Sequence, residues 1–301
     1  QSLFKVELPL RSQFEHPTVE GLARHLEEHL QSRAADASAA LAPIEVVSRS
    51  QPTAVSFSQR RIWLLHEMDP LGAAYNRCEA LRLRGHLQHA GLRLALDRMV
   101  LRHEAFRTTF TLGESEPMAV VGEVQPAVLV ELDGRGWADR EAEFERQAAQ
   151  FAGQPFDLAH GPLHRFLLVR LGEEDHALVM VMHHMIGVGW AWSILLRELQ
   201  ALYGAAVQGK TAAVPARAFD FIDFACWQRQ HIGDEALAAQ TRYWMEQLAG
   251  WAPLNLPTDT ALDRRTGSQG ARARLDLPQV WIERLQRFSA QHSLSPFMSL
   301  L

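Results

Sequence analysis

The sequence predicts an α/β fold, a sandwich in which helices pack on a sheet whose strands need not be parallel. Residues 163–171 and 176–183 are apolar segments separated by a short polar turn, which is typical of two neighbouring strands. Residues 190–203 follow with apolar side chains at three- and four-residue steps, as in an amphipathic helix. Helical and strand periodicities alternate along the rest of the chain, which indicates helical layers on a sheet.

The first predicted element is an amphipathic helix over residues 17–30, and Pro17 suits its first turn. Residues 31–43 are rich in Ala and Ser and show little apolar periodicity, so we predict a linker there. Further helices are predicted over residues 59–67, 90–102, 137–151, 219–230 and 237–248, and further strands over residues 79–87 and 106–112.

Composition excludes several classes of protein. Hydrophobic residues make up 47% of the 301 residues and charged residues 22%, which is typical of a chain with a sizeable core. The net charge of −5 does not favour nucleic acid as a partner. Apolar runs such as 177–182 are far shorter than the roughly 20 residues of a membrane-spanning helix. Two cysteines, Cys78 and Cys226, are too few for a disulfide framework, so we expect a soluble, cytoplasmic protein without a membrane partner.

The most informative segment joins the strand at 176–183 to the helix at 190–203. The strand ends at His183, and because neighbouring strand side chains point to opposite faces, only one of His183 and His184 can face a given cleft. Gly187 and Gly189 permit close backbone approach, and a helix starting near Trp190 would direct its N-terminal amides towards the cleft. An imidazole beside backbone donors suits acyl transfer, which needs a proton acceptor and an oxyanion site.

Other chemistries have less support. Adjacent histidines do not converge on one ion as an i, i+4 pair does, and no HExxH spacing occurs, so no metal site is expected. No Gly-x-Ser-x-Gly elbow or phosphate-binding loop is present. A structural role for a histidine at a strand end stays open as the alternative.

Several motifs resemble, in order, the core motifs of nonribosomal peptide synthetase condensation domains, which belong to the chloramphenicol-acetyltransferase-like superfamily. They are residues 56–65 (SFSQRRIWLL), Tyr75-Asn76, 102–110 (RHEAFRTTF), 183–189 (HHMIGVG), 221–228 (FIDFACWQ), 256–259 (LPTD) and 295–298 (SPFM). Upstream, residues 8–23 (LPLRSQFEHPTVEGLA) resemble the tail of a peptidyl carrier domain. Motifs in this order are far more specific than a His-His pair alone.

The resemblance implies a V-shaped pair of chloramphenicol-acetyltransferase-like lobes with a tunnel between them. It divides the chain into a carrier-domain tail (1–30), the linker (31–43), an N-terminal lobe (44–220) and the beginning of a C-terminal lobe (221–301). Because the chain is apolar up to Leu301, we expect the second lobe to be truncated there.

The implied reaction is amide formation between a donor acyl or peptidyl thioester and the amine of an acceptor aminoacyl thioester. Both substrates would be carried by 4′-phosphopantetheine arms of partner carrier domains, the donor upstream and the acceptor downstream, with an adenylation domain adjoining. The chain would then be a monomeric segment of a megasynthase.

The resemblance places His184 at the centre of the tunnel and the amide of Gly189 near the oxyanion. Since an α-amino group has a pKa of about 7.7–8.0, much of the nucleophile is already neutral near pH 7. We therefore interpret His184 as a residue that positions the amine and accepts its proton. His183 is a supporting residue, and Trp190 and Ser193 are candidates for substrate binding.

The chain departs from the family motif at Val188, where the family has Asp. That Asp is implied to pair with an arginine on a neighbouring strand, which corresponds here to Arg165. Either another acid serves Arg165, or the loop carrying His184 is displaced, or the domain no longer condenses substrates; an engineered substitution is a further alternative. On the sequence alone, we expect Val188→Asp to raise thermal stability or activity, because an unpaired buried charge costs about 3–5 kcal/mol.

Two further arginines, Arg102 and Arg107, are interpreted as architectural pairing partners rather than reacting groups. Two alternatives to the condensing enzyme remain. One is a condensation-like domain that serves as a binding platform for a tailoring enzyme, which Val188 favours. The other is a related acyltransferase that uses a CoA thioester, against which the carrier-like residues 1–30 argue.

Overall fold

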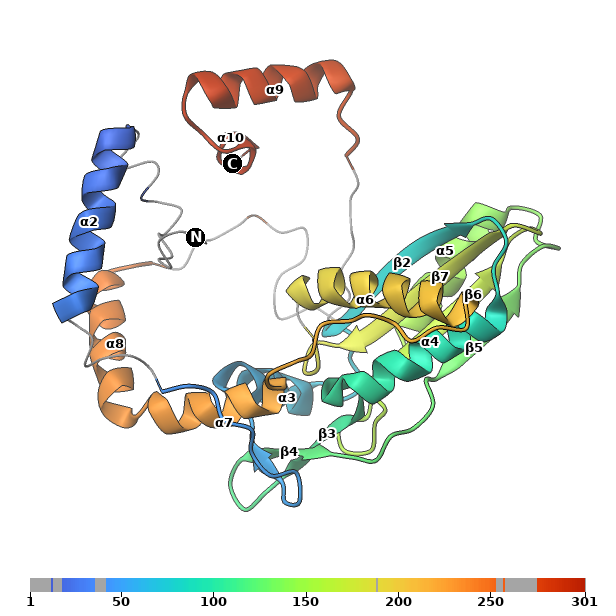
Figure 1. The fold of residues 1–301 in the computed structure, drawn as a ribbon, viewed down its shortest axis with the longest axis horizontal. Helices are drawn as coiled ribbons and strands as arrows, with labels where there is room; N and C mark the ends of the chain where they lie inside the picture. The colour runs from blue at the N-terminus through green and yellow to red at the C-terminus, as the bar shows by residue number, and fades with distance from the viewer. Residues whose placement is uncertain are drawn as a thin grey trace. The chain divides into compact units, whose positions relative to one another are not determined.

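The computed structural model describes residues 12, 18–35, 42–187, 189–252, 257 and 275–300. The chain forms two compact units (Figure 1). One unit comprises Pro43–Gln269, and the other comprises Gln1–Ala42 with Gly270–Leu301. None of the described helices is long and apolar enough to cross a membrane.

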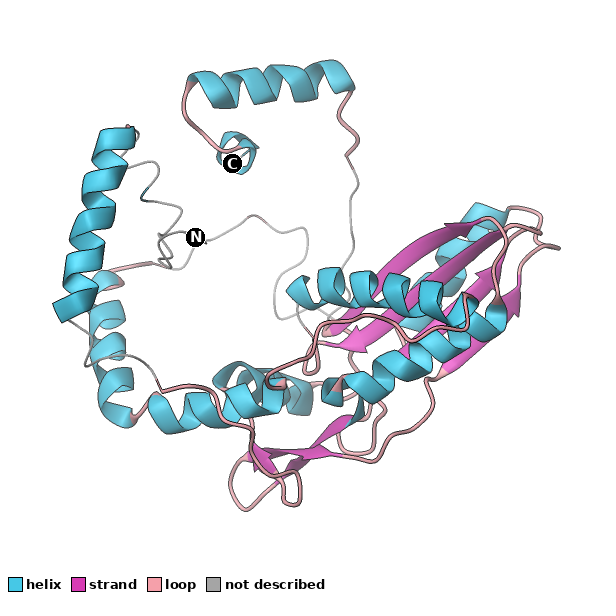
Figure 2. Cartoon of the chain, viewed as in Figure 1, coloured by secondary structure: helices cyan, strands magenta, loops and turns pink. Residues whose placement is uncertain are grey.

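The larger unit is built on a four-stranded mixed sheet (Figure 2). In spatial order its strands are β2 (Asn76–Arg84), β7 (Asp175–His183), β6 (His164–Arg170) and β5 (Leu129–Asp133). Strand β7 is antiparallel to both of its neighbours, and β5 is parallel to β6. A mixed sheet with helical layers confirms the predicted α/β fold class.

Strand β7 is covered by helices on both faces. Helices α4 (His89–Arg102) and α6 (Gly189–Val207) lie over one face, and α5 (Arg140–Ala152) lies over the other. Because strand side chains alternate, Met180 and Met182 pack towards α4 and α6, while Val179 and Val181 pack towards α5. All four are at most 2% exposed. Burial on both faces explains why this strand is almost continuously apolar.

A smaller sheet and three helices complete this unit. The sheet contains, in order, β1 (Thr53–Ala54), β4 (Pro117–Val121) and β3 (Thr108–Leu112), and a 3₁₀ turn, Glu104–Arg107, precedes β3. The helices are α3 (Phe57–Met68), α7 (Phe221–His231) and α8 (Asp234–Gln247). Phe110 of β3 and Ile222 of α7 join the core cluster that contains Val179 and Val181.

The other unit contains helices α2 (Val19–Ala35), α9 (Gln279–Gln291) and α10 (Pro296–Leu300). The hydroxyls of Ser289 in α9 and Ser299 in α10 lie 2.8 Å apart. Residues 8–11 and 13–17 of the carrier-like motif and residues 256 and 258–259 of the LPTD motif lie outside the described residues.

Several predicted element ends differ from the structure. Helix α2 continues to Ala35 rather than ending at residue 30, because residues 31–35 lack Gly and Pro and Ala strongly favours helix. The strand predicted over 79–87 starts at Asn76 and ends at Arg84, since Gly85 adopts a φ of 100° and breaks the extended backbone.

A buried ion pair joins the segment before β1 to helix α7. The two terminal nitrogens of Arg49 donate to the two carboxylate oxygens of Asp223 over 2.6 and 2.9 Å, and its Nε donates to Glu104 over 2.8 Å. Asp223 is 1% exposed and also accepts the backbone N–H of Val47 over 2.8 Å and of Asp220 over 2.7 Å. Burial alone would raise the pKa of Asp223, but these hydrogen bonds hold that pKa below its ordinary value.

We predict that Arg49→Met lowers the free energy of unfolding by roughly 3 kcal/mol, because the Asp223 carboxylate would stay buried without its cation. The control is Arg93→Met, which breaks the exposed Arg93–Glu131 pair and should cost less than about 1 kcal/mol. Urea unfolding measures both, and equal losses would contradict the assignment.

The same pair predicts a dependence on pH. A carboxyl whose folded pKa is lowered stabilises the protein above its unfolded pKa of about 3.9, and that stabilisation disappears as the pH falls through the folded pKa. The stability advantage of the wild type over Arg49→Met should therefore be constant near neutrality and shrink at acidic pH, as the Asp223 carboxyl takes up a proton first in the variant and then in the wild type. Urea titrations across this range test it.

Candidate active site

The loop between β7 and α6 is fixed by main-chain hydrogen bonds to two other segments. The N–H of His183 donates to the carbonyl of Leu163 over 2.9 Å, and the N–H of His184 donates to the carbonyl of Tyr75 over 2.8 Å. The loop then turns on an Ile186 N–H bond to the His183 carbonyl, 3.0 Å long. His184 is therefore held where the first residues of β2 meet the end of β7.

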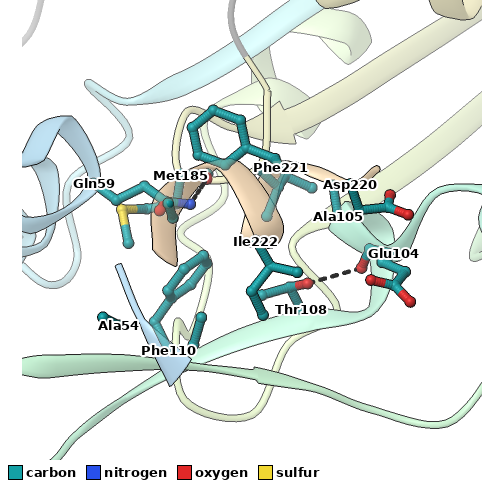
Figure 3. A pocket seen from close by; sticks show the side chains of 13 residues that line it. Ala54, Gln59, Glu104, Ala105, Thr108, Phe110, Met185, Asp220, Phe221 and Ile222 are labelled. Atoms are coloured by element: carbon teal, nitrogen blue, oxygen red, sulfur yellow. Dashed lines mark hydrogen bonds between the residues drawn. The ribbon is translucent and has the colours of Figure 1, made fainter. Parts of the chain in front are cut away.

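Gln59 of α3 also holds this loop, through a side-chain hydrogen bond. Its Nε2 donates to the carbonyl of Met185 over 3.0 Å, and its Oε1 accepts the N–H of Ser56 over 3.0 Å (Figure 3). Ser56 Oγ accepts the Gln59 N–H over 3.2 Å, which completes a capping box at the start of α3. Our sequence interpretation did not identify Gln59 as a site residue, although the Ser-x-x-Gln spacing is a capping-box signal.

The pocket in Figure 3 lies beside this hydrogen bond. Its volume is about 20 Å³, and Ala54, Phe110 and Ile222 line it together with Gln59 and Met185. It has room for about one water molecule and none for a substrate.

His183 is a buried, neutral residue that shapes the loop. Its Nδ1 accepts the N–H of Met185 over 3.2 Å, which leaves the proton on Nε2. Its ring contacts those of His66 and Phe156 at centroid distances of 5.6 and 6.2 Å. Burial, reinforced by the nearby rings of His66 and His184, lowers the pKa of His183 to about 4. Near pH 7 it therefore puts no positive charge beside His184.

His184 is half-buried and lines a cavity of about 240 Å³. The cavity walls are mainly apolar and include Phe106, Met182, Ile194 and Leu195. The Nδ1 of His184 is buried and makes no hydrogen bond within the described structure. An imidazole on the wall of an apolar cavity is suited to exchange a proton with a ligand through a ring nitrogen that the ligand can reach.

The polar wall of this cavity is a closed hydrogen-bond network. His103 Nε2 lies 2.7 Å from Glu198, and its Nδ1 lies 3.3 Å from a nitrogen of Arg217, which also donates to Asp220 over 2.5 Å. Arg102 donates to the same oxygen of Glu198 over 3.0 Å. Burial lowers the pKa of His103, so it is neutral near pH 7 with both ring nitrogens bonded. His184 differs from it in having an unused nitrogen.

The remaining predicted site residues occupy several places. Gly189 is the first residue of α6, so its N–H belongs to the helix N-terminus, where amides lack intrahelical acceptors. Ser193 is exposed on α6 and does not line the cavity, whereas Ala191, Ile194 and Leu195 do, because the helical period places them on the opposite face. Val188 and the side chain of Trp190 lie outside the described structure.

The predicted arginines do not line the cavity. Arg102 pairs with Glu198, as described. Arg107 donates to the carbonyl of Gly122 over 2.9 Å and lies 3.5 Å from Glu104. Arg102 connects α4 to α6, and Arg107 connects the turn before β3 to the segment after β4.

Arg165 is bonded to main-chain carbonyls. Its guanidinium donates to Phe151 over 3.2 Å, to Pro155 over 3.3 Å and to Gln154, and it lies over the ring of Phe156, 3.9 Å from the centroid. Burial lowers the pKa of Arg165 to about 10, so it stays positively charged near neutral pH. None of the described carboxylates pairs with it.

The described residues contain no group of three or more His, Cys, Asp or Glu side chains that could hold a metal ion. The polar groups around His184 are instead arranged by backbone and side-chain hydrogen bonds.

We predict that Gln59→Leu lowers the free energy of unfolding by about 1–3 kcal/mol, because it leaves the Met185 carbonyl and the Ser56 N–H without their buried partner. The matched control is Gln200→Leu on the exposed surface of α6, which should change stability by less than about 0.5 kcal/mol. If urea unfolding gave the same loss in the free energy of unfolding for both variants, the assignment of Gln59 as the residue that holds the loop would be wrong.

A second prediction, on the pH dependence of stability, follows from the lowered pKa of His183. In the unfolded chain this histidine takes up a proton near pH 6.5, whereas the folded state takes one up only near pH 4. Stability should therefore fall as the pH drops from about 6.5 to 4. His183→Gln should flatten this slope, and the rest should persist because buried His164 also has a pKa of about 4. Urea unfolding at several pH values measures the difference, and an unchanged slope would contradict it.

Comparison with known proteins identifies the family. The condensation-domain family matches residues 49–301. The chain is 37% identical to a linear gramicidin synthase of Brevibacillus parabrevis over 301 residues, which is 99% of this chain and 4% of that protein. It is 34% identical to phosphinothricin tripeptide synthetase PhsC of Streptomyces viridochromogenes over 253 residues, which is 83% of this chain and 23% of that protein.

Solved structures of related domains also match this chain. The X-domain from teicoplanin biosynthesis matches with a TM-score of 0.65 and 29% identity, over 73% of this chain and 48% of that one. The starter condensation domain of rhizomide synthetase RzmA shares the fold, with a TM-score of 0.61 and 21% identity, over 67% of this chain and 49% of that one. The chain thus spans a small part of its curated relatives, and it belongs to the condensation-domain family of nonribosomal peptide synthetases.

Proposed function

We propose that this domain forms an amide bond between a donor acyl or peptidyl thioester and the amine of an acceptor aminoacyl thioester. The observation that carries the proposal is the position of His184. Its ring lies on the wall of the 240 Å³ apolar cavity with a buried, unused nitrogen, while the main chain on either side is fixed. Family membership supports the same reaction class.

Amide formation does not require His184 to act as a strong base. The acceptor nitrogen forms a bond to the donor carbonyl carbon, and the carbon–sulfur bond then breaks. The proton released from nitrogen passes to His184 and from there to the departing sulfur. Because an α-amino group has a pKa of about 7.7–8.0, His184 acts by positioning the amine and receiving its proton as the carbon–nitrogen bond forms.

The developing oxyanion needs a donor. Gly189 begins α6, a helix of 19 residues, and amides at a helix N-terminus favour negative charge. We assign the Gly189 N–H to this role. Trp190 and Ser193 remain candidates for contacts with the substrate along the same helix.

Both substrates would arrive on carrier domains. When bound, the 4′-phosphopantetheine arm of a carrier supplies the thiol that activates the acyl group as a thioester. The largely apolar lining around His184 fits an uncharged acyl thioester. Within this chain, His184 and Gly189 are the residues that would meet its reactive end.

The partners would be an upstream donor carrier and a downstream acceptor carrier, with an adenylation domain adjoining. Residues 1–30 would be the tail of the upstream carrier, 31–43 a linker, 44–220 the N-terminal lobe and 221–301 the beginning of the C-terminal lobe. The similarity to the linear gramicidin synthase supports this division, since it extends through nearly the whole chain although the condensation-domain match starts at residue 49.

We predict that His184→Ala lowers the rate of amide formation by about 10²–10⁴-fold without unfolding the protein. A single-turnover assay in the full polypeptide, with loaded donor and acceptor carriers, measures the rate. His160→Ala is the matched control, because His160 is an exposed histidine paired only with nearby Asp157 in the described contacts. A folded His184→Ala protein with full activity would refute the proposed role.

A binding platform for a tailoring enzyme is the second candidate, and the replacement of the motif Asp by Val188 favours it. The same assay separates the two functions, because a platform would bind loaded carriers and form no amide. Adding CoA thioesters in place of the donor carrier tests the related CoA-dependent acyltransferase.

A further inference from the structure

Helix α5 ends beside the candidate site, and side chains from two strands of the sheet donate to carbonyls of its last turn and of the loop that follows it. The last carbonyls of a helix have no intrahelical partner and carry the negative end of its dipole. Asn76, the first residue of β2, donates its Nδ2 to the carbonyls of Ala152 and Gln154, over 2.7 Å each. Arg165 of β6 donates to the carbonyls of Phe151, Pro155 and also Gln154. We call Asn76 and Arg165 on this helix end the α5 clasp.

The clasp places electron-rich groups around the positive charge of Arg165. Three carbonyl dipoles face its guanidinium, and the electron-rich face of Phe156 lies 3.9 Å from it. Each of these groups favours a cation. These contacts offset part of the cost of burying the charge, although burial still holds the pKa of Arg165 below its ordinary value.

The clasp also reaches the candidate active site. Asn76 pairs in register with His183, and the preceding residue, Tyr75, accepts the N–H of His184. Phe156 contacts the ring of His183 at a centroid distance of 6.2 Å. A shift of the α5 end would therefore move both sides of the loop that carries His184.

We infer that the α5 clasp positions His184. The inference rests on the proposed function of His184.

The test compares Arg165→Met and Asn76→Ala with Arg146→Met in the full polypeptide. Arg146 is an exposed arginine of α5 that pairs with Glu143, so it controls for the loss of an arginine beside this helix. Both clasp variants should lower the rate of amide formation, by up to about 10²-fold for a displaced His184. They should also shift the ¹³C and ¹⁵N resonances of the His184 ring. Arg165→Lys should restore only part of the rate, because an ammonium lacks the planar fork. Arg146→Met should change neither property.

Failure of the proposed function and failure of this inference give different results. If the wild type formed no amide, the proposed function would fail, while the His184 resonances would still report on the clasp. Asn76→Ala removes no charge and so remains informative if Arg165→Met does not fold. The inference is overturned if the His184 resonances in both clasp variants match those of Arg146→Met.

Discussion

Burial of β7 on both faces is the constraint on which the rest of the structure depends. A strand that packs against α4 and α6 on one side and α5 on the other cannot slip in register without moving every side chain to the wrong face. The end of the strand is therefore fixed in space. His183 and His184 stand at that end, and the hydrogen bonds from Tyr75, Leu163 and Gln59 extend the same rigidity into the loop.

Electrostatics then give similar side chains different roles. Burial keeps His183 and His103 neutral, and hydrogen bonds occupy Nδ1 of His183 and both ring nitrogens of His103, whereas His184 retains a buried nitrogen without a partner in the described structure. The arginines likewise differ in the groups that surround their charges. Arg49 and Arg102 pair with carboxylates, and Arg165 is held by carbonyl dipoles and an aromatic ring. The local partners decide the chemistry available to each of these side chains.

Much of the fold was predictable from local patterns. The apolar runs of β6 and β7, and the helical periodicity of α4 and α6, predicted elements that the structure confirms within a few residues. Strands β1, β4 and β5 were not predicted, because strands of two to five residues carry little periodic signal. The position of His184 was predictable because it follows directly from where β7 ends. Gln59 was not identified, since a capping box shows only how its own helix begins, and the contact with Met185 spans 126 residues of sequence.

The sequence by itself determined the family, the α/β class and the two histidines at the end of a buried strand, because ordered motifs and periodicity are properties of neighbouring residues. Only the tertiary structure decided which groups surround them. The cavity beside His184, the closed network around His103 and the carbonyls that hold Arg165 come from segments far apart in the chain. Arg165 shows the difference most clearly. Its motif suggests a missing acid, and only the packing of α5 reveals that a helix end faces its charge.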